Sequence, residues 1–118
     1  SGLFFQNYYL NQEPTLNQTK QSPTGHYLRY GAWNNKNPNP FFDSTWYLSR
    51  YRDVHIAAEN PLYHFVKYGW KEGRDPHPDF STNRYLEDNP DVRNRGINPL
   101  AHYLLHGILE GRKIYPST

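Results

Sequence analysis

The stretch DFSTNRYLEDNPDVRNRGINPLAHYLLHGILEGRKIYP, residues 79–116, is the last of three similar units in a chain of 118 residues. Shifting the sequence by 38 residues, without gaps, gives 14 identical positions between 41–78 and 79–116 and nine between 3–40 and 41–78. Self-similarity at a fixed period is the signature of repeat architectures. The sequence therefore predicts one repeat domain, 3–118, with units of about 3–40, 41–78 and 79–116. Seven positions are identical in all units: Phe4, Tyr9, Leu10, Pro23, His26, Gly31 and Pro40 recur 38 and 76 residues later.

Each unit is predicted to contain two short helices. In the second unit, Asp43 or Ser44 can cap a first helix through residues 45–48, and Arg52-Asp53-Val54 ends it. Asn60-Pro61 then supplies a cap and a first-turn proline for a second helix, whose apolar residues fall at the i, i+3, i+4 spacing of one helix face. These apolar residues are Leu62, Phe65 and Val66, repeated as Leu100, Tyr103 and Leu104.

The ends of the units carry glycine and proline. Gly69 and Gly107 stand where a left-handed residue commonly closes a helix, and Asp75-Pro76-His77-Pro78 predicts an extended connector. Because helices of two to three turns are marginal alone, each unit needs its neighbours. We expect an all-α fold in which three helical-hairpin repeats stack as a small solenoid-like domain with Pro-rich connectors. The divergent first unit, with Asn34-Asn35-Lys36 in place of Glu-Gly-Arg, is interpreted as an end cap or a degenerate copy.

Composition narrows the functional classes. The chain has no cysteine, so disulfides and thiolate chemistry are excluded, and it has no apolar run long enough to cross a bilayer. The net charge of +2 lies entirely in the first unit, which disfavours a continuous basic stripe and hence nucleic-acid binding. Ser1-Gly2 is interpreted as a protease-cleavage remnant, with the domains of a parent protein lying elsewhere. Nothing in the chain assigns a cellular location.

The motif of the third unit resembles a known kind of repeat. Phe80, Tyr85-Leu86, Asn89-Pro90-Asp91-Val92, the stretch 98–104, Gly107 and Glu110-Gly111-Arg112 carry the resemblance. They are similar to short repeats appended to bacterial glycosyltransferases of surface-polysaccharide synthesis and to some bacterial surface proteins. The likeness is specific in the second and third units and partial in the first. It implies an accessory, glycan-associated module without catalytic residues.

The repeated histidine and arginine have structural and ligand-binding interpretations. His64 and His102 could contact a ligand, but a histidine in every unit favours a bond to a backbone carbonyl or to the aspartate of the preceding turn. His102 and His106 have the helical spacing of a zinc pair, but only one unit has the second imidazole, so no metal or other cofactor is expected. Arg74 and Arg112 could bind carboxylate, sulfate or phosphate, or could pair within the fold beside Glu72 and Glu110.

The tryptophans do not recur, which favours a role in a specific site. Trp33, Trp46 and Trp70 occupy three different positions of the repeat. Aromatic faces stack on the apolar faces of sugar rings, although core filling is equally compatible with the sequence. Trp46, beside Tyr47-Leu48, is expected in the core, whereas Trp70, beside Lys71, is expected to be exposed.

These patterns favour a binding module over an enzyme. No nucleophile–histidine motif, phosphate-binding loop or helix with paired carboxylates is present in the sequence. The leading hypothesis is a lectin-like carbohydrate-binding module of a larger bacterial protein. It would hold a polysaccharide, including an anionic one, and tether an enzyme to it through Trp33, Trp46, Trp70, Lys71, Arg74, Arg112, His64 and His102. The alternatives are a protein-interaction or oligomerisation module, because helical repeats commonly bind protein, and a simple spacer.

Overall fold

The computed structural model describes residues 2–118, and these are all-helical, as expected. Isolated bridges between single residues are the only β pairing in this range. The α-helices are α1 (Gln6–Gln12), α2 (Pro23–Arg29), α3 (Ser44–Arg50), α4 (Arg52–Ile56), α5 (Pro61–Lys67), α6 (Thr82–Asp88), α7 (Pro90–Arg95) and α8 (Pro99–His102). Single turns of 3₁₀-helix, η1 (Leu16–Gln18), η2 (Gly31–Asn34) and η3 (Gly69–Glu72), and one π-helical turn, η4 (Tyr103–Gly107), complete the elements.

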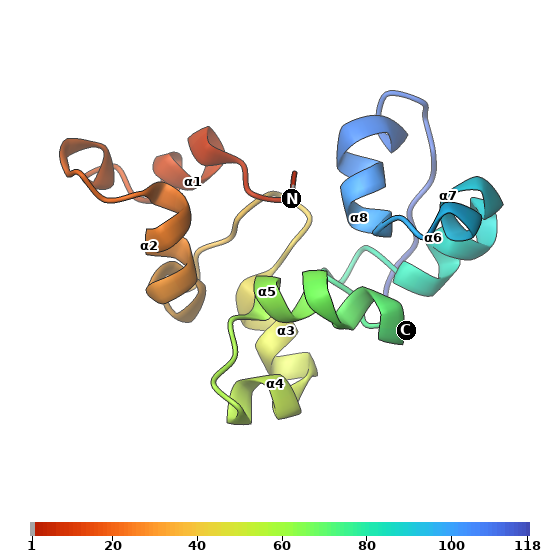
Figure 1. The fold of residues 1–118 in the computed structure, drawn as a ribbon, viewed down its shortest axis with the longest axis horizontal. Helices are drawn as coiled ribbons and strands as arrows, with labels where there is room; N and C mark the ends of the chain where they lie inside the picture. Colours follow the sequence, from red (N-terminus) through yellow and green to blue (C-terminus); the bar gives the residue numbers. More distant parts are fainter. Residues whose placement is uncertain (1) are drawn as a thin grey trace.

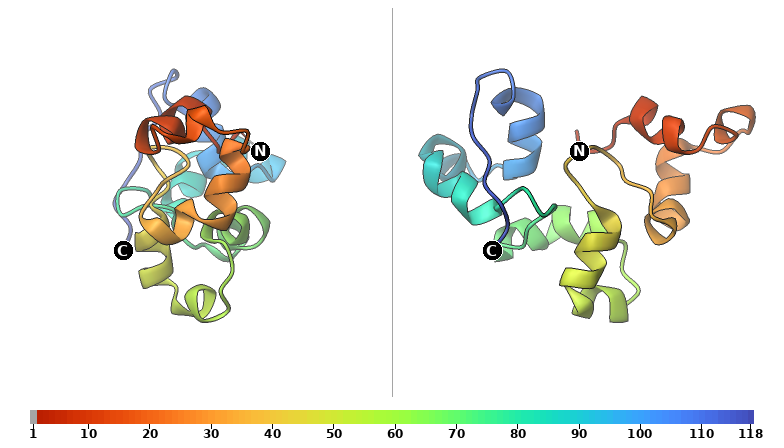
Figure 2. Two further views of the ribbon diagram at one scale, coloured as in Figure 1. Left: turned by 90° about the vertical axis from the view of Figure 1, so that its left-hand side faces the viewer. Right: turned by 180° about the vertical axis from the view of Figure 1, so that it is seen from behind.

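The helices form three groups arranged as an arc. In Figure 1, α1 and α2 lie on one side, α3 to α5 at the bottom and α6 to α8 on the other side, and the view from behind in Figure 2 shows the same order. The N-terminal segment lies near the third group, where Gly2 approaches the side chain of Leu105. The radius of gyration is 14.3 Å, close to the value expected of a compact domain of this length.

The helix starts follow the predicted capping chemistry. Asp43, rather than Ser44, caps α3 by accepting a hydrogen bond from the backbone N–H of Trp46. Ser22, Asn60 and Asn98 cap α2, α5 and α8, each followed by proline at the first helical position. The prediction of two helices per unit was wrong for the second and third units, because the segments after Tyr51 and Asn89 continue as the short helices α4 and α7. Proline at the first position of α7 begins a helix there as well as ending the previous one.

A tyrosine–histidine hydrogen bond recurs in the core of all three groups. The hydroxyl oxygens of Tyr9, Tyr47 and Tyr85 lie 2.7, 2.9 and 2.8 Å from Nδ1 of His26, His64 and His102. The three tyrosines have at most 1% exposure, and each also packs against the phenylalanine five residues earlier. The partner of the histidine is therefore the tyrosine, not the backbone carbonyl or aspartate expected from sequence. A neutral imidazole has one donor and one acceptor nitrogen, which suits it to a phenol.

The repeated glycine is required by this pair and not by backbone conformation. Gly31, Gly69 and Gly107 have no left-handed φ angle, so the role predicted for Gly69 and Gly107 was wrong. A Cβ atom at any of the three would overlap the hydroxyl of the tyrosine in the same unit. The left-handed residues come four positions later, at Asn35, Gly73 and Gly111.

Each connector returns to the beginning of its own unit. The backbone N–H groups of Phe5 and Asp43 donate to the carbonyls of Pro38 and Pro76 at 2.8 and 2.9 Å, and Ser81 donates to Tyr115 at 2.8 Å. The same connectors carry the chain into the next unit, so they fix where successive first helices begin.

Candidate functional site

A cleft of about 220 Å³ lies between the first and second groups of helices. Its apolar surface comes from one tryptophan, one alanine and one leucine, and its polar groups are an amide, two hydroxyls and an imidazole. The lining residues are Ala32, Trp33, Asn35, Thr45, Leu48, Ser49 and His55. Imidazole apart, no ionisable side chain lines this cleft.

The turn that ends the first unit positions Trp33. η2 follows α2 directly, and the N–H of Trp33 donates to the carbonyl of Tyr30 at 3.1 Å. Asn35 then adopts a left-handed conformation with φ of 62°, and its side-chain oxygen accepts a hydrogen bond from the hydroxyl of Thr45. Ala32 is 1% exposed whereas Trp33 is 39% exposed, so the turn buries one side chain and presents the next to solvent.

Trp70 occupies a different environment from the one predicted. It aligns with the buried Ala32, and its ring packs against the core while its indole N–H donates to the carbonyl of Val66 at 3.1 Å. Lys71 takes the position of Trp33, and its Nζ lies 5.7 Å from the Trp70 ring centroid. Trp70 is therefore half-buried, and the expectation that it would be the most exposed tryptophan was wrong; Trp33 is more exposed.

Trp46 lies at the margin of the structure rather than in the core. The core positions of α3 are Tyr47 and Leu48, the next two residues. Trp46 is half-buried, makes an edge contact with Tyr51 at 6.3 Å between ring centroids, and has the Arg50 guanidinium 5.9 Å from its ring. The expectation of a core residue was therefore wrong, because the buried face of α3 carries Tyr47 and Leu48 instead.

Arg74 and Arg112 are engaged within their own units. Arg74 donates from both terminal nitrogens to the Asp53 carboxylate, each at 2.8 Å, and from Nε to Glu72 at 2.8 Å. Arg112 makes the corresponding bonds to Asp91 and Glu110. The hydrogen bonds from Arg74 lower the pKa of Asp53 to about 2, and the pKa of Asp91 is lowered in the same way. A guanidinium group whose N–H groups already donate to carboxylates has less capacity for an anionic ligand.

The histidines of the predicted site are likewise occupied by the fold. His64 and His102 are buried, and each shares Nδ1 with its tyrosine. Burial lowers the pKa of His102 below its ordinary range. Of the eight sequence-predicted site residues, the structure places only Trp33 in the cleft between the first two groups.

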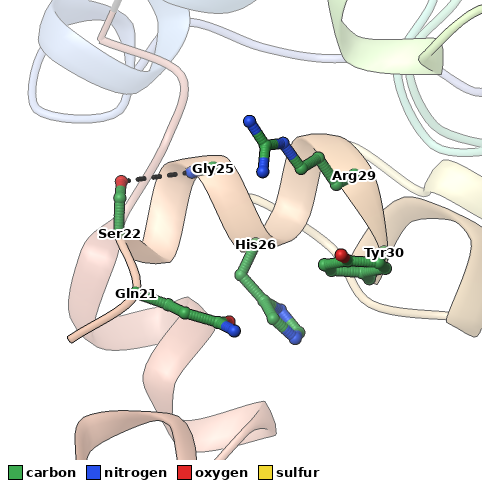
Figure 3. Close-up of a pocket in the computed structure, with 6 residues that line it drawn as sticks. All are labelled: Gln21, Ser22, Gly25, His26, Arg29 and Tyr30. Atoms are coloured by element: carbon green, nitrogen blue, oxygen red, sulfur yellow. Dashed lines mark hydrogen bonds between the residues drawn. The ribbon is translucent and has the colours of Figure 1, made fainter. Parts of the chain in front are cut away.

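A second cleft, of about 230 Å³, lies along α2 and is drawn in Figure 3. Gln21, His26 and Tyr30 point to the same side of the helix there, while Arg29 points away from them. Tyr30 is 51% exposed, and its ring centroid is 5.4 Å from that of His26. A cleft of about 350 Å³ lies at the equivalent place in the third unit, beside His102 and His106.

Sequence reasoning named Trp33 in the first cleft and His102 and Arg112 in the cleft of the third unit, and it missed most of the other residues that line these clefts. The residue one helical turn after the repeated histidine is aromatic in every unit: Tyr30, Tyr68 and His106. That recurrence was a usable signal. No such signal in the sequence marks Asn35, Thr45, Ser49 and His55, because they come together only when one unit packs on the next.

Two further kinds of feature are absent from residues 2–118. No group of three or more histidine, cysteine or carboxylate side chains there is arranged to hold a metal ion. None of the helices in this range has the length and apolarity needed to span a bilayer.

Comparisons with protein-family profiles, curated proteins and solved structures found no match to this chain.

Proposed function

We propose that this chain is a non-catalytic carbohydrate-binding module of a larger bacterial protein, built from three stacked 38-residue units. The observation that carries the proposal is the cleft around Trp33. A partly exposed indole beside an apolar floor and several neutral hydrogen-bonding groups is the combination that suits a sugar ring, whose faces are apolar and whose rim is polar.

The groups of the cleft have separate roles in this proposal. The indole of Trp33 would stack on one face of the sugar, with Leu48 completing the apolar surface. Asn35, Ser49 and His55 would exchange hydrogen bonds with the hydroxyls at the edge of the ring. The lining lacks carboxylate, ammonium and guanidinium groups, and Arg74 and Arg112 are engaged elsewhere, which favours a neutral sugar over an anionic one.

The size of the cleft favours weak binding of one sugar residue. Its volume of about 220 Å³ is below the range of about 300–1,000 Å³ that is usual for drug-sized ligands. A polymer offers many copies of the same residue, and several weak contacts raise the overall affinity when they belong to one molecule. The module would in this way tether its parent enzyme to a polysaccharide.

The test begins with a glycan array that includes neutral, uronic, sulfated and phosphorylated polymers. The best neutral oligosaccharide is then titrated into ¹⁵N-labelled chain, up to about 10 mM so that millimolar affinities are visible. We expect the indole N–H of Trp33 to shift on titration. The substitution Trp33→Ala should weaken binding at least about tenfold, equivalent to about 1.4 kcal/mol.

Trp46→Ala is the matched control, because it removes another partly exposed indole that lies outside the cleft. It should leave the affinity unchanged. A blank array at this sensitivity would overturn the proposal. Binding that survives Trp33→Ala but is lost in Trp46→Ala would show that this cleft is not the binding site.

A further inference from the structure

The end of the third unit exposes an apolar turn. Leu109 is 89% exposed and Ile108 47% exposed, on the turn that follows η4. Adjacent exposed aliphatic side chains of this size mark a candidate contact surface.

The equivalent turn of the first unit contacts the following unit. Ile108 and Leu109 align with Ala32 and Trp33 of the first unit. Ala32 is 1% exposed, and both residues face Thr45, Leu48 and other residues of the second unit across the cleft. In the first unit this turn is therefore the surface on which α3, the first helix of the following unit, packs.

The first helix of the first unit leaves exposed the surface that the first helices of the other units bury. α3 meets the preceding unit through Ser44, whose hydroxyl lies 2.7 Å from the hydroxyl of Tyr27 and which is completely buried. Thr82, at the same position of α6, is also fully buried and donates to the carbonyl of Arg74 at 2.7 Å. Gln6, at that position of α1, is exposed.

α1 also repeats the residue pattern of the packed helices. Ser44, Thr45, Leu48 and Ser49 correspond to Gln6, Asn7, Leu10 and Asn11, which is again a leucine among small or neutral polar side chains. The α1 surface and the two aliphatic side chains carry no formal charge, and Glu110, the next residue of the turn, is paired with Arg112, so no like-charge pair opposes the contact.

From this pairing of surfaces we infer that a second copy of the chain docks head to tail, with its α1 against the Ile108–Leu109 turn. The contact continues the interface that joins α3 to η2 within the chain. Because the two surfaces differ, the association is heterologous and can extend beyond a dimer. This inference does not depend on carbohydrate binding.

Sedimentation equilibrium of the intact chain, between about 10 μM and about 1 mM, tests the inference in the range of weak protein association. We expect the mean mass to rise with concentration. Leu109→Glu should hold the chain at the monomer mass, and so should Gln6→Arg, which changes the opposite surface. Ile56→Glu is the matched control: Ile56 is 77% exposed on α4, away from both surfaces, and its substitution should leave association unchanged.

Mixing the two blocked variants identifies the geometry. Leu109→Glu retains an intact α1 surface and Gln6→Arg retains an intact apolar turn, so an equimolar mixture should form dimers and nothing larger. Circular dichroism of each variant shows whether it is folded. A native chain that stays monomeric at every concentration overturns the inference, as does a mixture of folded variants that stays monomeric while the native chain associates.

Discussion

The first and second units keep the same aromatic centre but hold its periphery differently. In both, a buried tyrosine bonds to a histidine seventeen residues later. In the second unit the Arg74 fork joins the end of the unit to Asp53 of α4. The first unit has Lys36 and Thr15 at these positions, and no ion pair joins them. The tyrosine–histidine–glycine arrangement is thus constant while the polar links around it are exchangeable.

The first unit has an uncharged link near the position of that ion pair. The side-chain amide of Gln12 donates to the carbonyl of Asn37 at 2.8 Å, and its oxygen accepts from the N–H of Asn37 at 2.9 Å. Two neutral hydrogen bonds therefore tie α1 to the connector. The comparison teaches that the packing at the centre, and not the ion pair, defines the unit.

The largest loss of stability should come from filling the space beside the Tyr47 hydroxyl. In Gly69→Ala the new methyl group overlaps the Tyr47 hydroxyl, and overpacking of a buried site costs about 3 kcal/mol in the free energy of unfolding. Urea denaturation followed by circular dichroism measures the loss. A Gly69→Ala variant as stable as the native chain would contradict this account.

A second substitution separates this clash from a general effect of alanine. Tyr47→Phe removes the overlapping oxygen, and the next atoms lie 3.4 Å from the new Cβ, so Tyr47→Phe with Gly69→Ala should recover most of the lost stability. In the first unit the Tyr9 ring carbon Cζ itself lies 2.9 Å from a Cβ at Gly31. Tyr9→Phe should therefore rescue Gly31→Ala less well.

An intermediate loss of stability is expected at high pH, from the first and third units alike. Burial raises the pKa of Tyr9 and of Tyr85 to about 12, from about 10 in the unfolded chain. The folded state holds these protons more tightly, so the stability is fully present below pH of about 10 and is lost as the pH rises through about 12. The urea midpoint, measured across this window, should be level at first and then fall.

The phenylalanine variants test whether the tyrosines cause this loss. Tyr9→Phe and Tyr85→Phe each remove one titrating group, and each should make the fall of the urea midpoint less steep than in the native chain. An unchanged slope in both would assign the alkaline loss to other groups.

Local chemistry made the helix starts predictable, whereas packing decided the rest. Asn60-Pro61 signals a cap and a first turn without reference to distant residues, and α5 begins there. Gly69 was recognised as special, but its reason is a hydroxyl that belongs to a residue 22 positions earlier. A glycine near the end of a helix fits both a left-handed cap and a close approach, and only the packed structure distinguishes them.

The candidate site was harder to predict because it lies between units. The absence of recurrence singled out Trp33, and the structure places it in a cleft. The same argument gave equal weight to Trp70. Trp70 stands one repeat position before that of Trp33, and there the 3₁₀ turn directs the side chain toward the core. A shift of one residue reverses exposure on a tight turn, and residue type alone does not reveal that register.

The smallest loss of stability is expected at the periphery of the units, and it should differ between the first and second units. Arg74→Met removes the hydrogen bonds to Asp53, and because the Asp53 side chain is 63% exposed the free energy of unfolding should fall by about 1 kcal/mol or less. Lys36→Met, the aligned change in the first unit, should have no effect on the free energy of unfolding.

The contribution of the Arg74–Asp53 hydrogen bonds also depends on pH. Since the pKa of Asp53 is lowered to about 2, this contribution is present above pH of about 4 and is lost as the pH falls through about 2. The difference between Arg74→Met and the native chain should accordingly be measurable by urea denaturation at neutral pH and vanish near pH 2. Equal losses in Arg74→Met and Lys36→Met would mean that both units depend on a cation at this position, and the contrast between them would not hold.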